Sequence, residues 1–421
     1  MAAAVGGVLA SNGTAFAGDP WQLSKEDEAF LDDLERQGCL FFWEQASEKT
    51  GQVLDRARND VSGGRRDPRR MASIAATGFG LTALCIADRR GYLPHVQVVE
   101  RVRITLDWHL NHMPEEHGFF YHFSDVDSGK RHDESEISSI DTSLLLCGVL
   151  SARGYFDDPA IQQLATQIYE RVDWPWMLNG GKTFSMGWKP ESGFLKARWS
   201  HYCELMMIYL LAIGSPAHPV PPECWDNFAR PVVHYAGFDY ISGNDPLFTH
   251  QFSHAWYDFR YKNDAYADYF ANSIKATRAH KAFCLSYPKW YSEQYWGISA
   301  SDYVGGYTAW GGPPAQGPLD GTVVLSAAAG SLPFLPRECV EVLRAMRSKW
   351  GKYAWGRYGF VDAFHPAANW YDSDVLGIDL GISVLMAENL RSGMVWKIFM
   401  QNPETVRAMQ RAGFHGQGLP A

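Results

Sequence analysis

The sequence predicts an all-α protein built as an (α/α)6 barrel, a double-layered α/α toroid, with long loops and a few short β hairpins at one end. About twelve segments carry the apolar spacing of helices. Some of them are apolar on nearly every side and others are amphipathic, which indicates an inner and an outer layer. The segments between them are long and rich in Gly, Pro and aromatic residues, which is typical of functional loops. An open solenoid of helical repeats is the alternative, but no fixed repeat period supports it.

The first helix is expected around residues 30–41, after a start signal from Ser24 to Asp27. Each later helix is expected from its own run of periodic apolar residues. The expected ranges are 74–87, 96–113, 138–153, 160–172, 205–213, 222–235, 264–286, 320–331, 337–350, 375–391 and 393–400, with a short last helix at 403–412. The alternation in residues 182–188 predicts one of the β hairpins.

The domain organisation is expected to be a single domain over residues 24–415, because the chain has no linker and no sharp change of composition. Residues 1–17 resemble the later part of a secretory signal, and Ala15-Phe-Ala17 has the form of a cleavage site. No Lys or Arg precedes the apolar stretch; a start codon assigned too late would explain this, and a disordered N-terminus is the alternative. We expect a periplasmic or secreted protein. No uninterrupted apolar run reaches about 18 residues, so we expect no membrane span.

The composition narrows the possible partners. A formal net charge of −9 offers no basic surface for nucleic acid, so a neutral or cationic ligand fits better than a polyanion. Aromatic residues make up 14% of the chain, and aromatic faces are common in sugar sites. The seven cysteines are widely spaced and are expected to be buried thiols rather than a disulfide scaffold or a zinc site. We expect no metal and no cofactor, and we expect a monomer.

Glu204 is the most informative residue, because it comes immediately before the dense apolar run 205–213. A buried carboxylate must be paired, hydrogen-bonded or protonated. Burial also raises a carboxyl pKa towards the range of a general acid. The neighbouring Trp199, His201 and Tyr202 offer rings and donors for a sugar, whereas Arg198 offers a purely structural ion pair. Both interpretations of Glu204 stand at this point.

A second acidic segment contains Asp133, Glu136 and Asp141, just before the apolar run 144–150. Acids at a helix N-terminus complement its dipole, and Ser138 and Asp141 have the spacing of a capping box. A structural role for Asp141 is therefore well supported. Asp133 and Glu136 precede the helix and are harder to explain as caps. The segment is a reasonable place for a catalytic base.

A third group contains His250, Gln251, His254 and Trp256. The two histidines have the i, i+4 spacing of a metal pair, but no third ligand has a recognised spacing. Hydrogen bonding to sugar hydroxyls is favoured over metal binding, and a structural helix start is the alternative. The late loops add further candidates for a polar and aromatic groove, namely Trp296, Asp302, Arg357, Tyr358, Trp370 and Asp379.

A series of segments between about residue 30 and residue 402 resembles, in the same order along the chain, the bacterial glycoamylase-like domain family. Its characterised members include endo-β-1,2-glucanases, and a related domain occurs in cyclic β-1,2-glucan synthases. The segments that carry the resemblance are Ser139-Ile-Asp141-Thr-Ser-Leu-Leu, Tyr202-Cys-Glu204-Leu-Met, Leu210-Leu-Ala-Ile-Gly-Ser-Pro-Ala-His218-Pro, Leu247-Phe-Thr-His-Gln-Phe-Ser-His-Ala-Trp256, Trp296-Gly-Ile-Ser-Ala-Ser-Asp302, Ala329-Gly-Ser-Leu-Pro-Phe334, Trp355-Gly-Arg-Tyr-Gly-Phe360 and Gly377-Ile-Asp379.

The resemblance implies an (α/α)6 barrel and an inverting, endo-acting hydrolase of β-1,2-glucan that needs no cofactor. It also implies that Glu204 is the general acid. The candidates for the general base are Glu136 and, after it, Asp141. Alternatively, the water is activated indirectly through a substrate hydroxyl. An exo-acting enzyme that releases a disaccharide, a lyase or transglycosylase, and a non-catalytic glycan-binding domain remain as alternatives.

Overall fold

The computed structural model describes residues 21–60, 64–243, 246–309, 311–313 and 319–419. The signal-peptide remnant expected over residues 1–17 lies outside this part of the chain. None of the helices within it combines the length and the apolar character that crossing a membrane requires.

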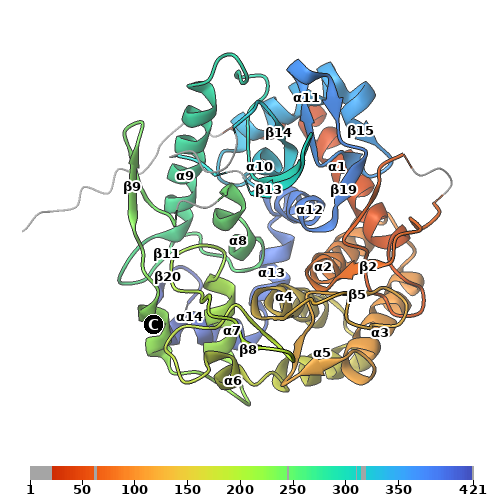
Figure 1. Ribbon diagram of the computed structural model, residues 1–421, viewed down its shortest axis with the longest axis vertical. Coiled ribbons are helices and arrows are strands. Elements are labelled where there is room, and N and C mark those ends of the chain that lie inside the picture. The colour runs from red at the N-terminus through yellow and green to blue at the C-terminus, as the bar shows by residue number, and fades with distance from the viewer. Residues whose placement is uncertain (1–20, 61–63, 244–245, 310, 314–318, 420–421) are drawn as a thin grey trace, which may run out of the picture.

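An inner group of helices is buried on almost every side. Its longer members are α2 (Ile74–Arg90), α4 (Ser139–Tyr155), α7 (Met206–Gly214) and α12 (Gly377–Arg391), and its short members are α8 (Phe252–Trp256) and α10 (Leu325–Ala329). Helix α2 packs between α4 and α12. Gly78 and Gly148 make the approach to α4 close, because a Cβ on Gly148 would lie 2.1 Å from the Gly78 carbonyl oxygen. Figure 1 shows α2, α4, α8 and α12 towards the middle of the molecule.

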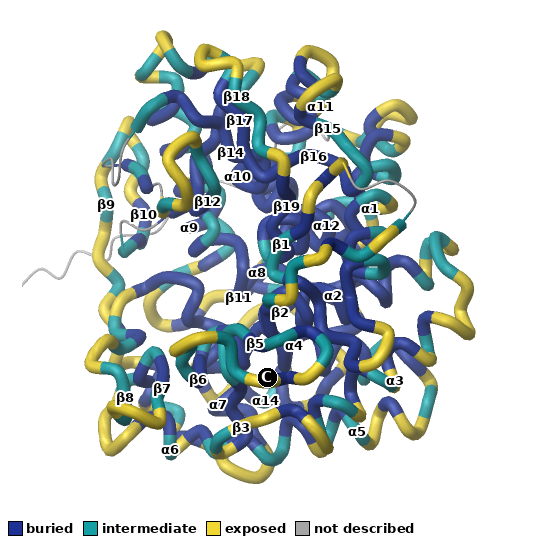
Figure 2. Tube along the Cα trace, turned by 45° about the vertical axis from the view of Figure 1, so that its right-hand side comes forward, coloured by how far each residue is buried: buried dark blue, intermediate teal, exposed yellow. Residues whose placement is uncertain are grey.

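An outer group of helices is amphipathic and packs on the inner group. It comprises α1 (Lys25–Glu44), α3 (His95–Asn111), α5 (Pro159–Glu170), α9 (Tyr269–Leu285), α11 (Pro336–Ala354) and α14 (Pro403–Arg411). Helix α1 contacts α2 and α12, α5 contacts α4, α11 contacts α10, and α14 contacts α7. Two further short helices are α6 (Trp174–Leu178) and α13 (Met394–Met400). Figure 2 shows the buried residues inside and the exposed ones at the rim, as two layers of helices require.

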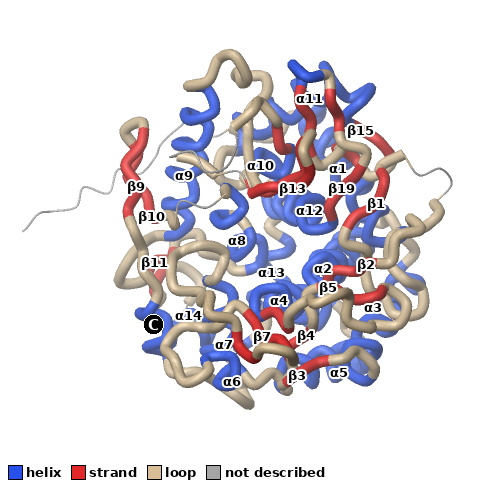
Figure 3. The backbone as a smooth tube through the Cα atoms, in the orientation of Figure 1, coloured by secondary structure: helices blue, strands red, loops and turns tan. Residues whose placement is uncertain are grey.

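The strands are short and form small antiparallel sheets (Figure 3). The pairs are β1 (Arg56–Arg58) with β19 (Asp374–Leu376), β2 (Met71–Ser73) with β5 (Phe123–Asp125), β3 (Glu115–Glu116) with β4 (Phe119–Phe120), β9 (Val232–Tyr235) with β10 (Phe238–Ile241), β11 (Lys262–Asn263) with β20 (His415–Gly416), β12 (Ala300–Tyr303) with β13 (Gly306–Ala309) and β15 (Trp355–Gly356) with β16 (Gly359–Phe360). The three-stranded sheets are β6 (Ile137–Ser138), β7 (Gly187–Lys189) and β8 (Gly193–Phe194), and β14 (Val323–Val324), β17 (Ala363–His365) and β18 (Trp370–Tyr371).

Four inner helices follow directly on a strand. Helix α2 follows β2, α4 follows β6, α10 follows β14 and α12 follows β19. The strands and their loops are therefore placed at the N-terminal ends of these helices. The positive ends of the helix dipoles point towards the same loops.

Most expected helices are confirmed within a few residues at each end. The helix expected at 222–235 is wrong: a 3₁₀ turn over Pro222–Asn227 precedes strand β9. Pro231 removes a backbone donor there, and the β-branched pair Val232 and Val233 favours a strand. Helix α10 covers only part of 320–331, since Val323 and Val324 form a strand.

The hairpin expected at 182–188 begins at Gly187, and α6 and α8 were not expected. Two other 3₁₀ turns cover Leu247–His250 and Pro366–Ala368. All seven cysteines are buried free thiols, as expected.

Candidate active site

A cleft lies at the N-terminal ends of the inner helices and consists of two adjoining cavities. Their volumes are about 530 Å³ and about 390 Å³, and Glu204 and Phe248 line both. The larger cavity is also lined by Asp55, Arg56, Met71, Ser73, His122, Phe123, Ile140, Asp141, Leu144, Phe252, Tyr307, Leu376 and Ile378. The smaller is also lined by Met186, Arg198, Trp199, Ser200, His201, Cys203, Gly243, Pro246, Thr249 and Ala309. Cavities of this size and mixed polarity are typical of ligand sites.

Glu204 lies two residues before α7 and is 9% exposed. Its backbone is fixed to α8, because the Ser253 hydroxyl donates to the Glu204 carbonyl oxygen at 2.7 Å. The same hydroxyl accepts from the Met207 backbone N–H at 3.1 Å. Trp199 forms part of the wall and donates from Nε1 to the Ser139 hydroxyl at 2.8 Å. The backbone of Glu204 is thus fixed, and its largely buried side chain lies where the two cavities adjoin.

His122 is placed between two acids on the other side of the larger cavity. Its Nδ1 lies 3.1 Å from Glu136 Oε1 and its Nε2 lies 3.5 Å from Asp141 Oδ1. Burial alone would lower the pKa of His122, but Asp141 and Glu136 outweigh burial and raise it to about 9. His122 in turn lowers the pKa of Glu136. At neutral pH His122 is therefore an imidazolium beside the carboxylate of Glu136.

Asp141 is also fixed from its own helix. Ser138 caps α4 by accepting from the Asp141 backbone N–H at 3.3 Å, and its hydroxyl donates to Asp141 Oδ2 at 2.5 Å. The structural role expected of this pair is confirmed. The other oxygen, Oδ1, is the one near His122. Asp141 therefore combines a cap with a place in the cleft wall.

Arg56 connects the larger cavity to a second acidic group. Its Nε donates to Asp55 Oδ2 at 3.2 Å and its Nη1 donates to Asp302 Oδ2 at 2.6 Å. Burial raises the pKa of Asp55 even though Arg56 opposes this effect. Tyr307, on the hairpin β12–β13 that carries Asp302, lines the same cavity.

Behind Asp302 lie three further aspartates. The Asp302 backbone N–H donates to Asp362 Oδ2 at 2.8 Å, and Asp379 Oδ1 accepts from the Ser326 hydroxyl at 3.0 Å. Burial raises the pKa of Asp379 and of Asp372 to about 7 and raises that of Asp362 well above its usual range. Among the residues that the structure describes, two groups have ligand atoms within 4.8 Å of one another, as a metal site needs: His122 with Glu136 and Asp141, and Asp302 with Asp362 and Asp372.

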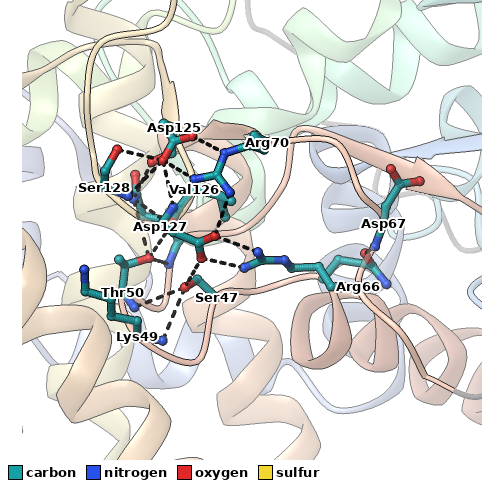
Figure 4. A network of polar contacts seen from close by, with 12 residues as sticks. Ser47, Lys49, Thr50, Arg66, Asp67, Arg70, Asp125, Val126, Asp127 and Ser128 are labelled. Carbon is teal, nitrogen blue, oxygen red and sulfur yellow. Dashed lines mark hydrogen bonds and ion pairs between the residues drawn. The ribbon is translucent and has the colours of Figure 1, made fainter.

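A network of arginines and aspartates fixes the end of strand β5 and the turn that follows it (Figure 4). Both Nη atoms of Arg66 donate to Asp127 at 2.7 Å, and the Ser47 hydroxyl donates to the same carboxylate at 2.7 Å. Arg70 binds Asp125 through Nε at 2.6 Å and Nη2 at 2.8 Å. These contacts fasten the turn after β5, and β5 begins with the cavity residue Phe123.

The sequence-predicted residues fall into three places. Glu204, Asp141, Arg198, Trp199 and His201 line the cleft. A second set is buried in the interior and does not line either cavity, namely Tyr202, His250, Gln251, His254, Trp256 and Trp296. Within this set, Trp256 donates to the Thr82 hydroxyl and Gln251 donates to Ser331 and to the Ala327 carbonyl. Burial lowers the pKa of His250 and His254 to about 3, so both are neutral.

The remaining predicted residues lie outside both cavities. Asp133 is exposed and contacts His132. Arg357 and Tyr358 both bind Glu44, and Trp370 is half-buried in β18. Glu136 reaches the cleft only through His122. Asp302 and Asp379 belong to the aspartate group described above.

The sequence reasoning missed Asp55, Arg56, His122, Phe248 and Tyr307. None of them belongs to a motif with a recognised spacing. Phe248 alone lies in a segment that carries the family resemblance, Leu247 to Trp256, and the other four lie outside those segments.

Comparisons with a family model and with known proteins give several matches. Residues 196–403 match the model of the family named Glycoamylase. An exo β-1,2-glucooligosaccharide sophorohydrolase (non-reducing end) from Parabacteroides distasonis is 26% identical over an alignment that covers 91% of this chain. The chain spans 58% of that relative's length.

Solved structures extend the likeness over nearly the whole chain. An endo-β-1,2-glucanase from Chitinophaga pinensis, solved with sophorotriose and glucose, has a TM-score of 0.85 and 27% identity, over 93% of this chain and 99% of that one. A β-1,2-glucanase from Parabacteroides distasonis has a TM-score of 0.84 and 25% identity, over 92% of this chain and 60% of that one.

Proposed function

Because the chain carries a domain of the glycoamylase-like family over residues 196–403, we propose that it is a glycoside hydrolase that cleaves β-1,2-glucan in the cleft at the N-terminal ends of its inner helices. One observation carries this proposal. Glu204 is a largely buried carboxyl placed where two cavities adjoin, so a sugar chain that fills both cavities passes it.

In the proposed reaction Glu204 donates its proton to the glycosidic oxygen as the bond to the anomeric carbon breaks. A water molecule forms the new bond to that carbon and gives up one proton to a base. The products are two shorter glucans, each with its hydroxyl restored.

We assign the base role to Asp141 in preference to Glu136. Asp141 lines the same cavity as Glu204, whereas Glu136 faces His122 from outside both cavities. The pKa of Glu136 is lowered by that histidine, which weakens it as a base. A water activated through a substrate hydroxyl is the other route.

The endo-acting, inverting form of the reaction is the one we favour. Cavities on both sides of Glu204 leave room for sugar units in both directions, as cleavage inside a chain requires. Exo action is the second candidate, and one observation favours it: the relative from Parabacteroides distasonis is an exo-acting sophorohydrolase.

We also propose that the two helical layers close into an (α/α)6 barrel and that the protein is an exported monomer.

Incubation with linear β-1,2-glucan tests the proposal. Endo action releases a range of oligosaccharides early in the reaction, whereas exo action releases disaccharide alone. Proton NMR of the first products gives the anomeric form, and inversion yields the α-anomer. Hydrolysis of other glucans with no product from β-1,2-glucan would contradict the proposed substrate. Binding of β-1,2-glucan without any products would favour a non-catalytic glycan-binding domain.

A further inference from the structure

Phe248 occupies the same junction of the cleft as Glu204. Among the described residues, these two alone line both cavities. The other aromatic rings of the cleft each line one cavity: Phe123, Phe252 and Tyr307 the larger, and Trp199 the smaller. The ring of Phe248 therefore lies where a sugar chain passes from one cavity into the other.

The ring of Phe248 is supported by the core and is still accessible from the cleft. Phe248 is half-buried and packs against the main hydrophobic core. The ring of Phe252, which is 4% exposed, lies 4.8 Å from it between centroids, with the two planes inclined by 39°. Phe123 differs, because the imidazole of His122 stacks on its ring at 3.8 Å between centroids. Phe248 thus offers a firmly held aromatic surface to a ligand.

One short segment positions both Phe248 and Glu204. Phe248 belongs to the 3₁₀ turn Leu247–His250, and α8 follows this turn directly. The Gln251 N–H donates to the Phe248 carbonyl at 2.8 Å. Two residues later, the Ser253 hydroxyl donates to the Glu204 carbonyl at 2.7 Å. The aromatic ring and the acid are therefore held in a fixed relation to each other.

The stereochemistry of a β-linked glucan suits such a ring. Every substituent of β-D-glucopyranose is equatorial, so both faces of the sugar ring carry only axial hydrogens. These hydrogens are weakly positive, whereas the face of an aromatic ring is negative. The side chain of Phe has no hydroxyl that needs a partner of its own. A glucose unit can therefore lie flat on Phe248 while its hydroxyls remain free to bind the polar side chains of the cleft.

We propose that Phe248 is a substrate-binding residue that stacks on the glucose unit next to the bond that is cleaved. By holding one whole unit at the junction, the ring places a glycosidic oxygen, rather than the middle of a sugar, beside Glu204. The inference rests on the proposed hydrolysis of β-1,2-glucan and adds to it the side chain that sets the register of the sugar chain.

The test compares Phe248→Leu and Phe248→Tyr with the wild type on two substrates. These are the shortest linear β-1,2-linked oligosaccharide that the wild type cleaves and the polymer. Phe248→Leu should lower kcat/KM up to about tenfold, because it removes the aromatic contact but keeps an apolar side chain. The loss should be the same on both substrates, since every productive complex has a unit beside the cleaved bond. Phe248→Tyr keeps the ring and should remain within about twofold of the wild type.

The matched control is Phe194→Leu. Phe194 is also half-buried and packs on Trp176 at 4.9 Å between ring centroids, but it lines neither cavity. This variant should have the kcat/KM of the wild type. Thermal unfolding checks that all three variants are folded at the assay temperature.

Wild-type kcat/KM in Phe248→Leu would overturn the inference, and so would an equal loss in Phe194→Leu. A loss confined to the polymer would place the ring at a distant sugar unit and would overturn it as well. If the wild type cleaves a different glucan, the proposed substrate fails, and the same variants on that glucan still decide the role of Phe248. If the wild type binds β-1,2-linked oligosaccharides without cleaving them, calorimetric titration replaces kinetics, and Phe248→Leu should raise Kd up to about tenfold. A wild type that neither binds nor cleaves any glucan would overturn both proposals.

Discussion

The imidazole of His122 contacts Glu136: its Nδ1 lies 3.1 Å from Glu136 Oε1. Its second nitrogen faces Asp141, so the ring joins a carboxylate outside the cavities to one in the cleft wall. The pKa of His122 is about 9, because Asp141 and Glu136 outweigh the effect of burial. His122 therefore supplies a positive charge to this acidic part of the cleft wall at neutral pH.

Replacing His122 with Gln should flatten the pH dependence of stability above neutrality. The pKa of His122 is higher in the folded protein than its ordinary value of 6.5. The stabilisation is therefore complete below about pH 6.5 and is lost as the pH rises through about 9. It amounts to at most about 3 kcal/mol for a shift of this size. Thermal unfolding between pH 6 and pH 10 measures it. Parallel Tm curves for the wild type and the variant would contradict the assignment.

Replacing Glu204 with Gln should lower kcat between about 100-fold and 10,000-fold, the range that general acid catalysis contributes. Gln has nearly the same shape but no acidic proton, so the fold and Tm should be preserved. Initial rates on linear β-1,2-glucan measure the effect. The control is Glu223→Gln, since Glu223 is an exposed acid that lines neither cavity. Near-normal rates for Glu204→Gln would remove Glu204 from the acid role.

The sequence predicted those features that depend on neighbours along the chain. The caps at Ser24 and Ser138 and the buried run after Glu204 follow from short spacings, and the structure has them. His122 could not be assigned in this way, because its charge depends on two acids that the fold brings to it. His254 had a suggestive spacing, yet in the structure it is neutral and hydrogen-bonded to Ser273 in the interior.

Asp141→Asn and Glu136→Gln should separate the two candidates for the base. Asp141→Asn should lower kcat by at least about 100-fold, because it removes the proton acceptor in the cavity. Glu136→Gln should lower it far less and should reduce the pKa of His122, since it removes one of its two partners. Histidine NMR titration reports the pKa. Greater loss of kcat in Glu136→Gln than in Asp141→Asn would reverse the assignment.

Substitution of His201 by Ala should weaken substrate binding, whereas substitution of Trp256 by Ala should reduce stability. His201 is exposed and lines the smaller cavity, so His201→Ala should raise KM by about fivefold, the value of one hydrogen bond, with Tm unchanged. Trp256 is fully buried and bound to Thr82, so Trp256→Ala should cost about 3–5 kcal/mol of unfolding free energy. Steady-state kinetics and denaturant unfolding measure the two effects. An unchanged stability of Trp256→Ala would contradict its role in the core.

Asp127→Asn should weaken the network that holds the turn after β5 (Figure 4). The bond from Arg66 lowers the pKa of Asp127 to about 2, so its stabilisation is present above about pH 4 and is lost as the pH falls through about 2. Solvent reaches about a third of the Arg66 and Asp127 side chains, so screening reduces the gain to about 1 kcal/mol. Acid unfolding should therefore be less steep in Asp127→Asn, and its Tm at neutral pH should be lower.

The matched control is Asp60→Asn, which breaks the more exposed pair with Arg58 and should change little. Equal losses in both variants would mean that the network does not stabilise the turn beyond an ordinary surface ion pair.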